Sequence, residues 1–331
     1  MVDINREGLD DFFRGLQVSF RNGFATEMPF AYERLCTMVK STTAAEDYTW
    51  LGEADEMREW LGERVIRQLA SHDYSIKNRK FELTLKAKKD DLEDDKIGAY
   101  STRAEAMGNA CKLQPARLVA EILQGKDKDG NALPSKLLKC YDEQNFFDDE
   151  HPVGKDGNIS LVSNDRGGTA RPYFYMLDLS RPLKPLIFQR RKELDFVSKT
   201  DTTSDHVFKY DEYLYGASVR NACGFGLWQC AMRSAAGTTG ATNAALLSLA
   251  TEVEAMAVAM RAYRSDEGRL LGINPRVIVC DPSAENDFRR MLSTANIPIG
   301  EAASPNHVRV NVNYNAFELI VVPFLSNVAP T

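Results

Sequence analysis

The chain has 331 residues, of which 44% are hydrophobic and 27% charged, as in ordinary folded proteins that bury a sizeable core. Its formal net charge of −6 argues against a protein that coats nucleic acid through its overall charge, because phosphate binding requires clustered cations. The length allows two domains, or one domain with extended appendages.

The six cysteines are scattered along the chain without a CxxC pair, which argues against a zinc knuckle. They are interpreted as buried free thiols in a reducing compartment, in preference to disulfides. The N-terminal sequence lacks the apolar core of a signal peptide, and no apolar run approaches the about 20 residues that a membrane span requires. We therefore expect a protein that folds in a cytoplasm and makes no membrane contact.

The first predicted element is an amphipathic helix with an aromatic stripe. Leu9, Phe12, Phe13, Leu16 and Phe20 recur at steps of three and four residues. Three glycines in the same segment lower its intrinsic stability, so the helix needs a surface to dock on. That surface is either the core of the same chain or a neighbouring subunit, and the sequence favours neither.

A second helical pattern covers residues 55–69, and the period then changes. Phe81, Leu83 and Leu85 alternate with polar residues, which predicts a half-buried strand, and the alternation is also present around Ile76. The basic stretch 77–80 either turns the chain into a hairpin or continues one strand. A segment this charged is not stable alone and must lie against the body of the protein or another subunit.

The acidic run 90–95 precedes a long predicted helix over residues 97–123. Carboxylates favour the positive end of a helix dipole, and the run lacks the ligand spacing of a calcium loop, so a capping role is expected. Pro115 either kinks this helix or begins a second segment at its first turn.

The second half of the chain is predicted to mix strands with helices, without internal repeats. The segment 243–263 has apolar residues on one face and few charges, which predicts a largely buried helix. Asp281 is expected to cap a helix that ends near Leu292. A polar loop is expected over 198–206, and strands are expected over 173–179, 186–189, 213–219, 276–280, 308–312 and 317–322.

Residues able to perform chemistry are sparse. Asp148, Asp149, Glu150 and His151 could hold a metal, but consecutive residues rarely converge on one ion, and a proline follows them directly. The chain has no GxSxG elbow, dinucleotide fingerprint or phosphate-binding loop, and only four histidines. We therefore expect no catalytic residue, no cofactor and no metal site. A metal-dependent hydrolase using Asp148, Glu150 and His151 is the alternative.

Several long segments resemble the major head subunit of Mu-like bacteriophages and prophages, in the order of that family. They span about residues 50–325, whereas the first fifty residues add little. The segments are WLGERVIRQL…HDYSIKNRKFELTLKAKKDDLEDDKIGAY, YDEQNFFDDEHPV, SRPLKPLIFQRRKELDF, DEYLYGASVRNACGFGLWQCAM and GRLLGINPRVIVCDPS.

The resemblance implies an α+β protein with the tailed-phage (Hong Kong 97-type) major capsid fold. The expected parts are an N-terminal arm over 1–45, an extended loop region over 46–95, a peripheral domain with a spine helix over 96–235, and an axial domain over 236–331. The strand-rich block 173–232 precedes the axial-like block, so the segment order differs from that of the better-known members of the fold.

The resemblance also implies a function. It predicts a major capsid protein that self-assembles into hexamers and pentamers of an icosahedral phage shell enclosing double-stranded DNA. The implied partners are other copies of the chain, a scaffolding protein, a maturation protease, a portal, a cement or decoration protein, and DNA through non-specific contacts. The protein is expected in the virion capsid, assembled in the host bacterial cytoplasm. A minor or decoration component of the head is a further alternative.

The extended loop and the N-terminal arm are expected to reach over neighbouring subunits through apolar and charged contacts. The basic group at 190–192 is either solvated surface or a contact with an acidic partner or packaged nucleic acid. The candidates for subunit contacts are Phe12, Phe13, Phe20, Lys77, Arg79, Lys80, Lys86, Lys88, Lys89, Asp90, Asp91, Asp94 and Asp95.

Overall fold

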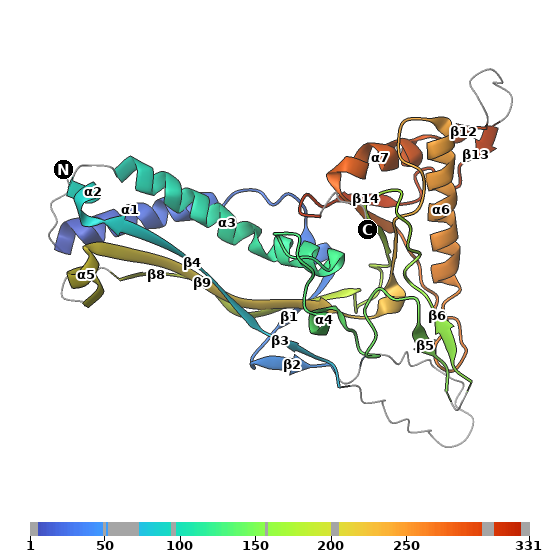
Figure 1. Cartoon of the computed structure of the whole chain (residues 1–331), viewed down its shortest axis with the longest axis horizontal. Coiled ribbons are helices and arrows are strands. Elements are labelled where there is room, and N and C mark those ends of the chain that lie inside the picture. The colour runs from blue at the N-terminus through green and yellow to red at the C-terminus, as the bar shows by residue number, and fades with distance from the viewer. Residues whose placement is uncertain are drawn as a thin grey trace.

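The computed structural model describes residues 6–48, 51, 73–93, 97–155, 158–199, 205–299 and 308–325. The helix expected over 55–69 and the candidates Asp94 and Asp95 lie outside these residues. Figure 1 shows two parts, which we call the elongated lobe and the compact lobe. The elongated lobe contains most of the described residues of the N-terminal third and two long central strands, and the compact lobe contains most of the described residues of the C-terminal third.

The elongated lobe is built on a four-stranded sheet in the order β1-β8-β9-β4. Its strands are β1 (Cys36–Lys40), β8 (Leu186–Lys199), β9 (Glu212–Phe225) and β4 (Arg79–Lys88). β9 is antiparallel to both neighbours, and β1 is parallel to β8. β8 is much longer than the strand predicted over 186–189. Two register irregularities between Arg190 and Asp195 interrupt the alternation of its side chains, so the sequence pattern reveals only the first part of the strand.

Two helices, α1 (Arg6–Phe24) and α3 (Ile97–Gln124), cover one face of this sheet (Figure 1). Phe12 packs edge-on against Tyr100 and Tyr215, with ring centroids 6.1 and 5.9 Å apart. The helices approach closely at glycine, since a Cβ on Gly108 would overlap the backbone carbonyl of Phe20. The aromatic stripe of α1 is therefore docked on its own chain.

Helix α3 is continuous through Pro115 and joins both lobes. Its first half packs beside α1 through Ala104 and Met107. Its last turns carry Leu118, Val119 and Ile122 into the main hydrophobic core. The expectation of a separate segment beginning at Pro115 is wrong, because the helical hydrogen bonding extends on both sides of it.

The hairpin interpretation of residues 74–88 is also wrong. β3 (Ser75–Lys77) pairs with β2 (Ala45–Asp47), whereas β4 pairs with β9 along its whole length. Only Asn78 separates β3 from β4. The charged strand thus lies against the body of its own chain.

The compact lobe contains a second four-stranded sheet, in the order β10-β7-β11-β14. It joins residues from both sides of the expected domain boundary at 235, since β7 and β10 precede that boundary and β11 and β14 follow it. Its strands are β10 (Ala231–Ser234), β7 (Phe174–Leu177), β11 (Val277–Cys280) and β14 (Glu318–Val321).

Helices α6 (Asn243–Arg261) and α7 (Glu285–Ser293) complete the main part of this lobe. Asp281 accepts hydrogen bonds from the backbone N–H groups of Ser283 and Ala284, at the 3-10 turn that leads into α7, which confirms the predicted cap. The smaller elements are η1 (Tyr32–Arg34), α2 (Lys89–Glu93), α4 (Ser135–Leu138), β5 (His151–Val153), β6 (Ser160–Val162), α5 (Asp205–Tyr210), η2 (Trp228–Cys230), η3 (Pro282–Ala284), β12 (Asn296–Pro298) and β13 (Val308–Val310).

The expectation that no segment has membrane-spanning length is wrong for α6, which is long and apolar enough by length and composition alone. Its apolar face, including Leu249, Val253 and Met256, is nevertheless buried in the main core, as the sequence predicts. The helix is therefore a core helix in this fold. All six cysteines are free thiols, and five of them are buried, as expected.

Candidate functional site

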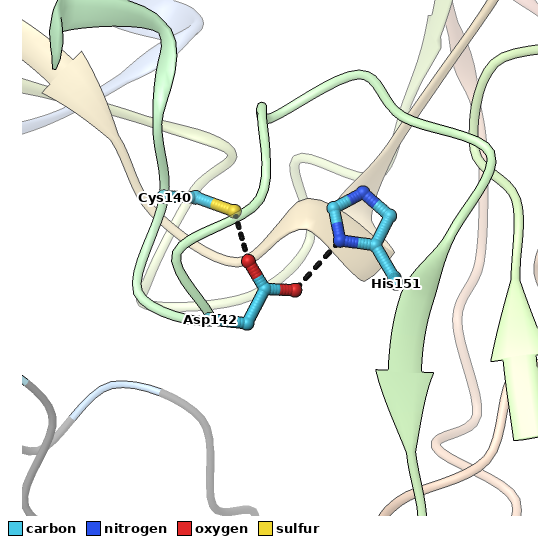
Figure 2. Close-up of side chains that lie close together, drawn as sticks. All are labelled: Cys140, Asp142 and His151. Atoms are coloured by element: carbon cyan, nitrogen blue, oxygen red, sulfur yellow. Dashed lines mark hydrogen bonds and ion pairs between the residues drawn. The ribbon is translucent and has the colours of Figure 1, made fainter. Parts of the chain in front are cut away.

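Three side chains that could act as metal ligands or nucleophiles meet where the loop after α4 faces β5. The carboxylate of Asp142 lies between Cys140 and His151 (Figure 2). The Cys140 thiol donates to Oδ1 of Asp142 at 2.8 Å, and Nδ1 of His151 lies 2.6 Å from Oδ2. Cys140 is buried, and the side chain of His151 has no exposed surface.

A tight turn brings Cys140 and Asp142 into position. The N–H of Cys140 donates to the carbonyl of Gln144, and Glu143 adopts a φ of 67°, in the left-handed region. Oδ1 of Asp142 also accepts from the N–H of Gln144 at 3.1 Å. The carboxylate therefore closes the turn as well as binding the thiol and the imidazole.

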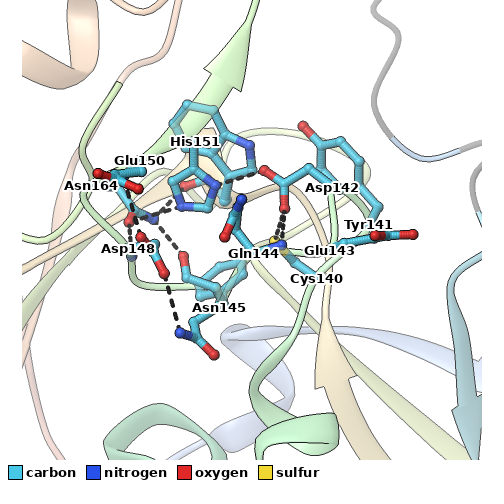
Figure 3. Close-up of polar contacts among 12 residues, drawn as sticks. Cys140, Tyr141, Asp142, Glu143, Gln144, Asn145, Asp148, Glu150, His151 and Asn164 are labelled. Carbon is cyan, nitrogen blue, oxygen red and sulfur yellow. Dashed lines mark hydrogen bonds and ion pairs between the residues drawn. The ribbon is translucent and has the colours of Figure 1, made fainter. Parts of the chain in front are cut away.

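The second ring nitrogen of His151 lies 3.2 Å from Oδ1 of Asn164 (Figure 3). The Asn164 amide group donates to the carbonyl of Phe146, so its oxygen faces His151 as an acceptor. Both ring nitrogens of His151 thus face acceptors. The imidazole also stacks on Trp228, with ring centroids 4.1 Å apart.

The electrostatics favour a structural role for this cluster. Burial, followed by the charge of Asp142, raises the pKa of the Cys140 thiol, so the sulfur is held as a protonated donor. Burial alone would raise the pKa of Asp142, but the hydrogen bonds from His151 and Cys140 outweigh it and lower that pKa. A cysteine nucleophile needs a thiolate, which this environment disfavours.

The predicted acidic group beside His151 does not form a site. The carboxylate of Asp148 accepts from the backbone N–H groups of Asp149 and Glu150, closing a turn on itself. Glu150 is exposed, whereas His151 points into the core. The hydrolase interpretation using Asp148, Glu150 and His151 therefore lacks a common site, because Glu150 faces solvent whereas His151 faces the core. Cys140 and Asp142 were missed, since only the folded turn brings them to His151.

The aromatic candidates for subunit contacts are used within the chain. Phe12 and Phe20 are buried, and Phe20 stacks on Phe196 with centroids 4.6 Å apart. Phe13 lies between Phe196 and Tyr215, at 5.7 and 5.6 Å. In this conformation the stripe stabilises the elongated lobe, and little of it faces outward.

The charged candidates lie on or beside β4. Alternate residues of this strand, including Lys80, Lys86 and Lys88, are exposed, whereas Ala87 on the other face is buried. Lys86 pairs with Glu212 of β9 at 3.2 Å.

The remaining charged candidates lie around both ends of β4. Lys77 ends β3, and the guanidinium of Arg79 lies over the ring of Phe81. Lys89 and Asp90 begin α2, and Asp91 accepts from the Tyr100 hydroxyl at 2.7 Å. The structure thus places the basic candidates on β4 and at its two ends, and it ties Asp91 to the chain's own α3.

Large apolar side chains are exposed at the far ends of the two lobes. Helix α5 lies at the distal end of the elongated lobe (Figure 1), and its Phe208 is 85% exposed. Val308, Val310 and Val312, in and just after β13, are also exposed on the compact lobe. Exposed apolar side chains grouped in this way are typical of surfaces that contact other proteins.

Comparison with known proteins identifies relatives among the head proteins of Mu-like phages and prophages. The family model described as Mu-like prophage major head subunit gpT matches residues 9–325. The chain is 34% identical over 322 residues to the major capsid protein of Escherichia phage Mu, covering 94% of this chain and 97% of that protein. It is 35% identical over 299 residues to the Mu-like prophage FluMu major head subunit of Haemophilus influenzae, covering 88% and 91%.

The fold has counterparts among solved structures. A chain of the procapsid of bacteriophage JBD30 aligns with a TM-score of 0.70 and 33% identity, over 97% of this chain and 100% of that chain. A chain of the bacteriophage JBD30 capsid aligns with a TM-score of 0.69 and 25% identity, over 92% and 94%. These alignments confirm the expected α+β capsid fold, and they extend over both lobes.

Proposed function

The chain belongs to the family of Mu-like prophage major head subunits, and on this premise we propose that its copies form the hexamers and pentamers of an icosahedral shell enclosing double-stranded DNA. The observation that carries the proposal is the likeness to a procapsid chain along nearly the whole length. The buried cluster of Cys140, Asp142 and His151 also agrees with a structural role, because burial raises the pKa of the Cys140 thiol and keeps it protonated as a hydrogen-bond donor.

The shape supports assembly through many modest contacts. The elongated lobe has helices on one face of its sheet, and on the other face it presents exposed charged side chains, among them Lys80, Lys86 and Lys88. Individually weak interfaces become stable when symmetry closes them into a shell. We expect the segments 1–45 and 46–95 to contribute contacts as arm and extended loop, with the peripheral domain at 96–235 and the axial domain at 236–331.

The same proposal includes the other components of head formation. A scaffolding protein, a maturation protease, a portal and a decoration protein would act on or bind the shell, which would assemble in the host bacterial cytoplasm. Packaged DNA would meet its inner surface through non-specific contacts. These partners are proposed because the family match describes a major head subunit, and they are the partners that such a role implies.

Electron microscopy of the purified full-length chain, and of particles from co-expression with its neighbouring head genes, tests the proposal. The expected result is shells in which this chain is the most abundant protein by mass. Particles that contain it only in minor amounts would support a minor or decoration component instead. A chain that stays monomeric even with the neighbouring head proteins would contradict the proposal.

A further inference from the structure

Three cations lie in register across the sheet of the elongated lobe. Arg220 of β9 is the direct partner of both Lys192 of β8 and Lys80 of β4. Directly opposed residues point to the same face, and adjacent strands are about 4.8 Å apart, so the three strand positions span about 10 Å. Like charges placed opposite each other destabilise a sheet, so folding alone does not account for this row.

The row lines an open hollow of about 370 Å³, together with Asn78 and Ser218. The hollow lies on the sheet face opposite α1 and α3, because the neighbouring Asn221 of β9 points to the helix side and bonds Gln114 of α3. Lys192 pairs with Asp195 at 2.9 Å. Within the described part of the chain, Lys80 and Arg220 form no ion pair, so most of the positive charge is uncompensated.

We propose that this hollow binds carboxylate side chains of a second copy of the chain. The proposal rests on the proposed function, because a shell places copies side by side. Opposite charges across such an interface fix its register and suppress wrong pairings.

The chain supplies the complementary charge. Its net charge is −6, and the sequence between residues 46 and 73 contains eight carboxylates against three arginines. Asp149 and Glu150 are also exposed. Phosphate groups of nucleic acid fit less well, because Glu82, Asp195 and Glu212 interrupt the cations of this face and would repel a polyphosphate backbone.

Chemical labelling of lysines in assembled particles and in disassembled full-length subunits tests the site directly. Lys80 and Lys192 should lose most of their reactivity on assembly, whereas exposed Lys136 of α4 reports the general effect of particle formation. Equal protection of Lys136, or unchanged reactivity of Lys80 and Lys192 in intact shells, would overturn the proposal. Shells with unprotected lysines leave the proposed function standing, whereas a chain that forms no assembly refutes both.

Cross-linking of amines to carboxylates by a carbodiimide identifies the source of the charge. Particles made from mixed isotopically light and heavy copies should give links between Lys80 or Lys192 and an Asp or Glu of another copy. Links confined to one copy, such as Lys192 to Asp195, would overturn the proposal. Protection that is present in filled particles but lost in emptied, nuclease-treated shells would assign the hollow to phosphates instead.

Variants separate charge from packing. Arg220→Glu with Lys80→Glu should abolish shells, whereas Lys80→Arg with Lys192→Arg should retain them. Lys136→Glu makes the same kind of charge change elsewhere and should leave assembly unchanged. Circular dichroism and size-exclusion chromatography check that each variant subunit is folded, and normal shells from the folded double reversal would contradict the inference.

Discussion

The two lobes each contain a four-stranded sheet, but they use it in opposite ways. In the compact lobe every residue of β7 and β11 is buried. In the elongated lobe β4 alternates, with Ala87 buried and Lys86 and Lys88 exposed. The compact lobe therefore buries its central strands within the chain, whereas the elongated lobe leaves one face of its sheet exposed to solvent. Changes to exposed residues of the elongated lobe should alter assembly, and changes to buried residues of either lobe should alter stability.

The largest expected effect is on assembly. Reversing Lys86, Lys88 and Lys89 to glutamate should abolish shell formation, because these cations are proposed to face acidic patches on a neighbour. The subunit should remain folded, since Lys86 and Lys88 are exposed and Lys89 is half-buried, and substitutions at such surface positions usually change stability by about 0.5 kcal/mol or less each. Electron microscopy measures shells, and the corresponding triple arginine variant is the matched control. Normal particles from the glutamate variant would remove this surface from the proposed contacts.

The next effect concerns the buried cluster at Asp142. Asp142→Ala leaves the donors of His151 and Cys140 without their acceptor, so the free energy of unfolding should fall by about 1–3 kcal/mol for each unpaired donor. Denaturant unfolding measures this loss. Asp149→Ala, at an exposed carboxylate in the same region, should change stability by about 0.5 kcal/mol or less. Similar small changes from both variants would show that the cluster contributes little.

A smaller effect is expected at the contact of α1 with α3. Gly108→Ala adds a methyl group against the carbonyl of Phe20, which should lower the free energy of unfolding by about 1–3 kcal/mol. Gly15→Ala in α1 meets no atom within 4 Å and should stabilise the helix by up to about 1 kcal/mol. Thermal unfolding compares the two variants. Equal shifts in the same direction would contradict this account of the helix contact.

The smallest effect is a dependence on acid pH. The pKa of Asp142 is lower in the folded chain than in the unfolded chain, so its carboxylate contributes stability that is complete above pH about 4. This contribution is lost as the pH falls through the folded pKa. Asp142→Asn should make the decline of stability in acid shallower, whereas Asp149→Asn should not. An unchanged slope in the Asp142 variant would show that other carboxyl groups control acid unfolding.

Much of the fold can be predicted from the spacing of apolar and capping residues in the sequence. The apolar steps of Leu9 to Phe20 predict α1, and Asp281 before a proline predicts the cap that leads into α7. Both signals are local, so one segment of sequence is enough to read them. The length of β8 was missed, because its irregularities lie in the charged run 190–195, where the alternation of a strand is lost.

The candidate sites were harder to predict because they depend on pairing between distant segments. The contacts of Cys140 and His151 with Asp142 depend on a turn in which Glu143 adopts a left-handed backbone conformation. A glutamate rarely adopts this conformation, so its presence in the sequence does not predict the turn. The row of Lys192, Arg220 and Lys80 exists only in the observed register, and a slip of one residue would send a side chain to the other face.

Helix α3 gives the two lobes a common mechanical element. Its 28 residues form a rod about 42 Å long that is anchored in both hydrophobic regions. We therefore expect that a tilt of the elongated lobe would be transmitted through α3 to the core of the compact lobe. The rod is weakest at the turn before Pro115, because proline has no backbone N–H to donate there. We expect that subunits at positions of different curvature in a shell would differ most in the bend of α3 at that turn, where bending costs the least free energy.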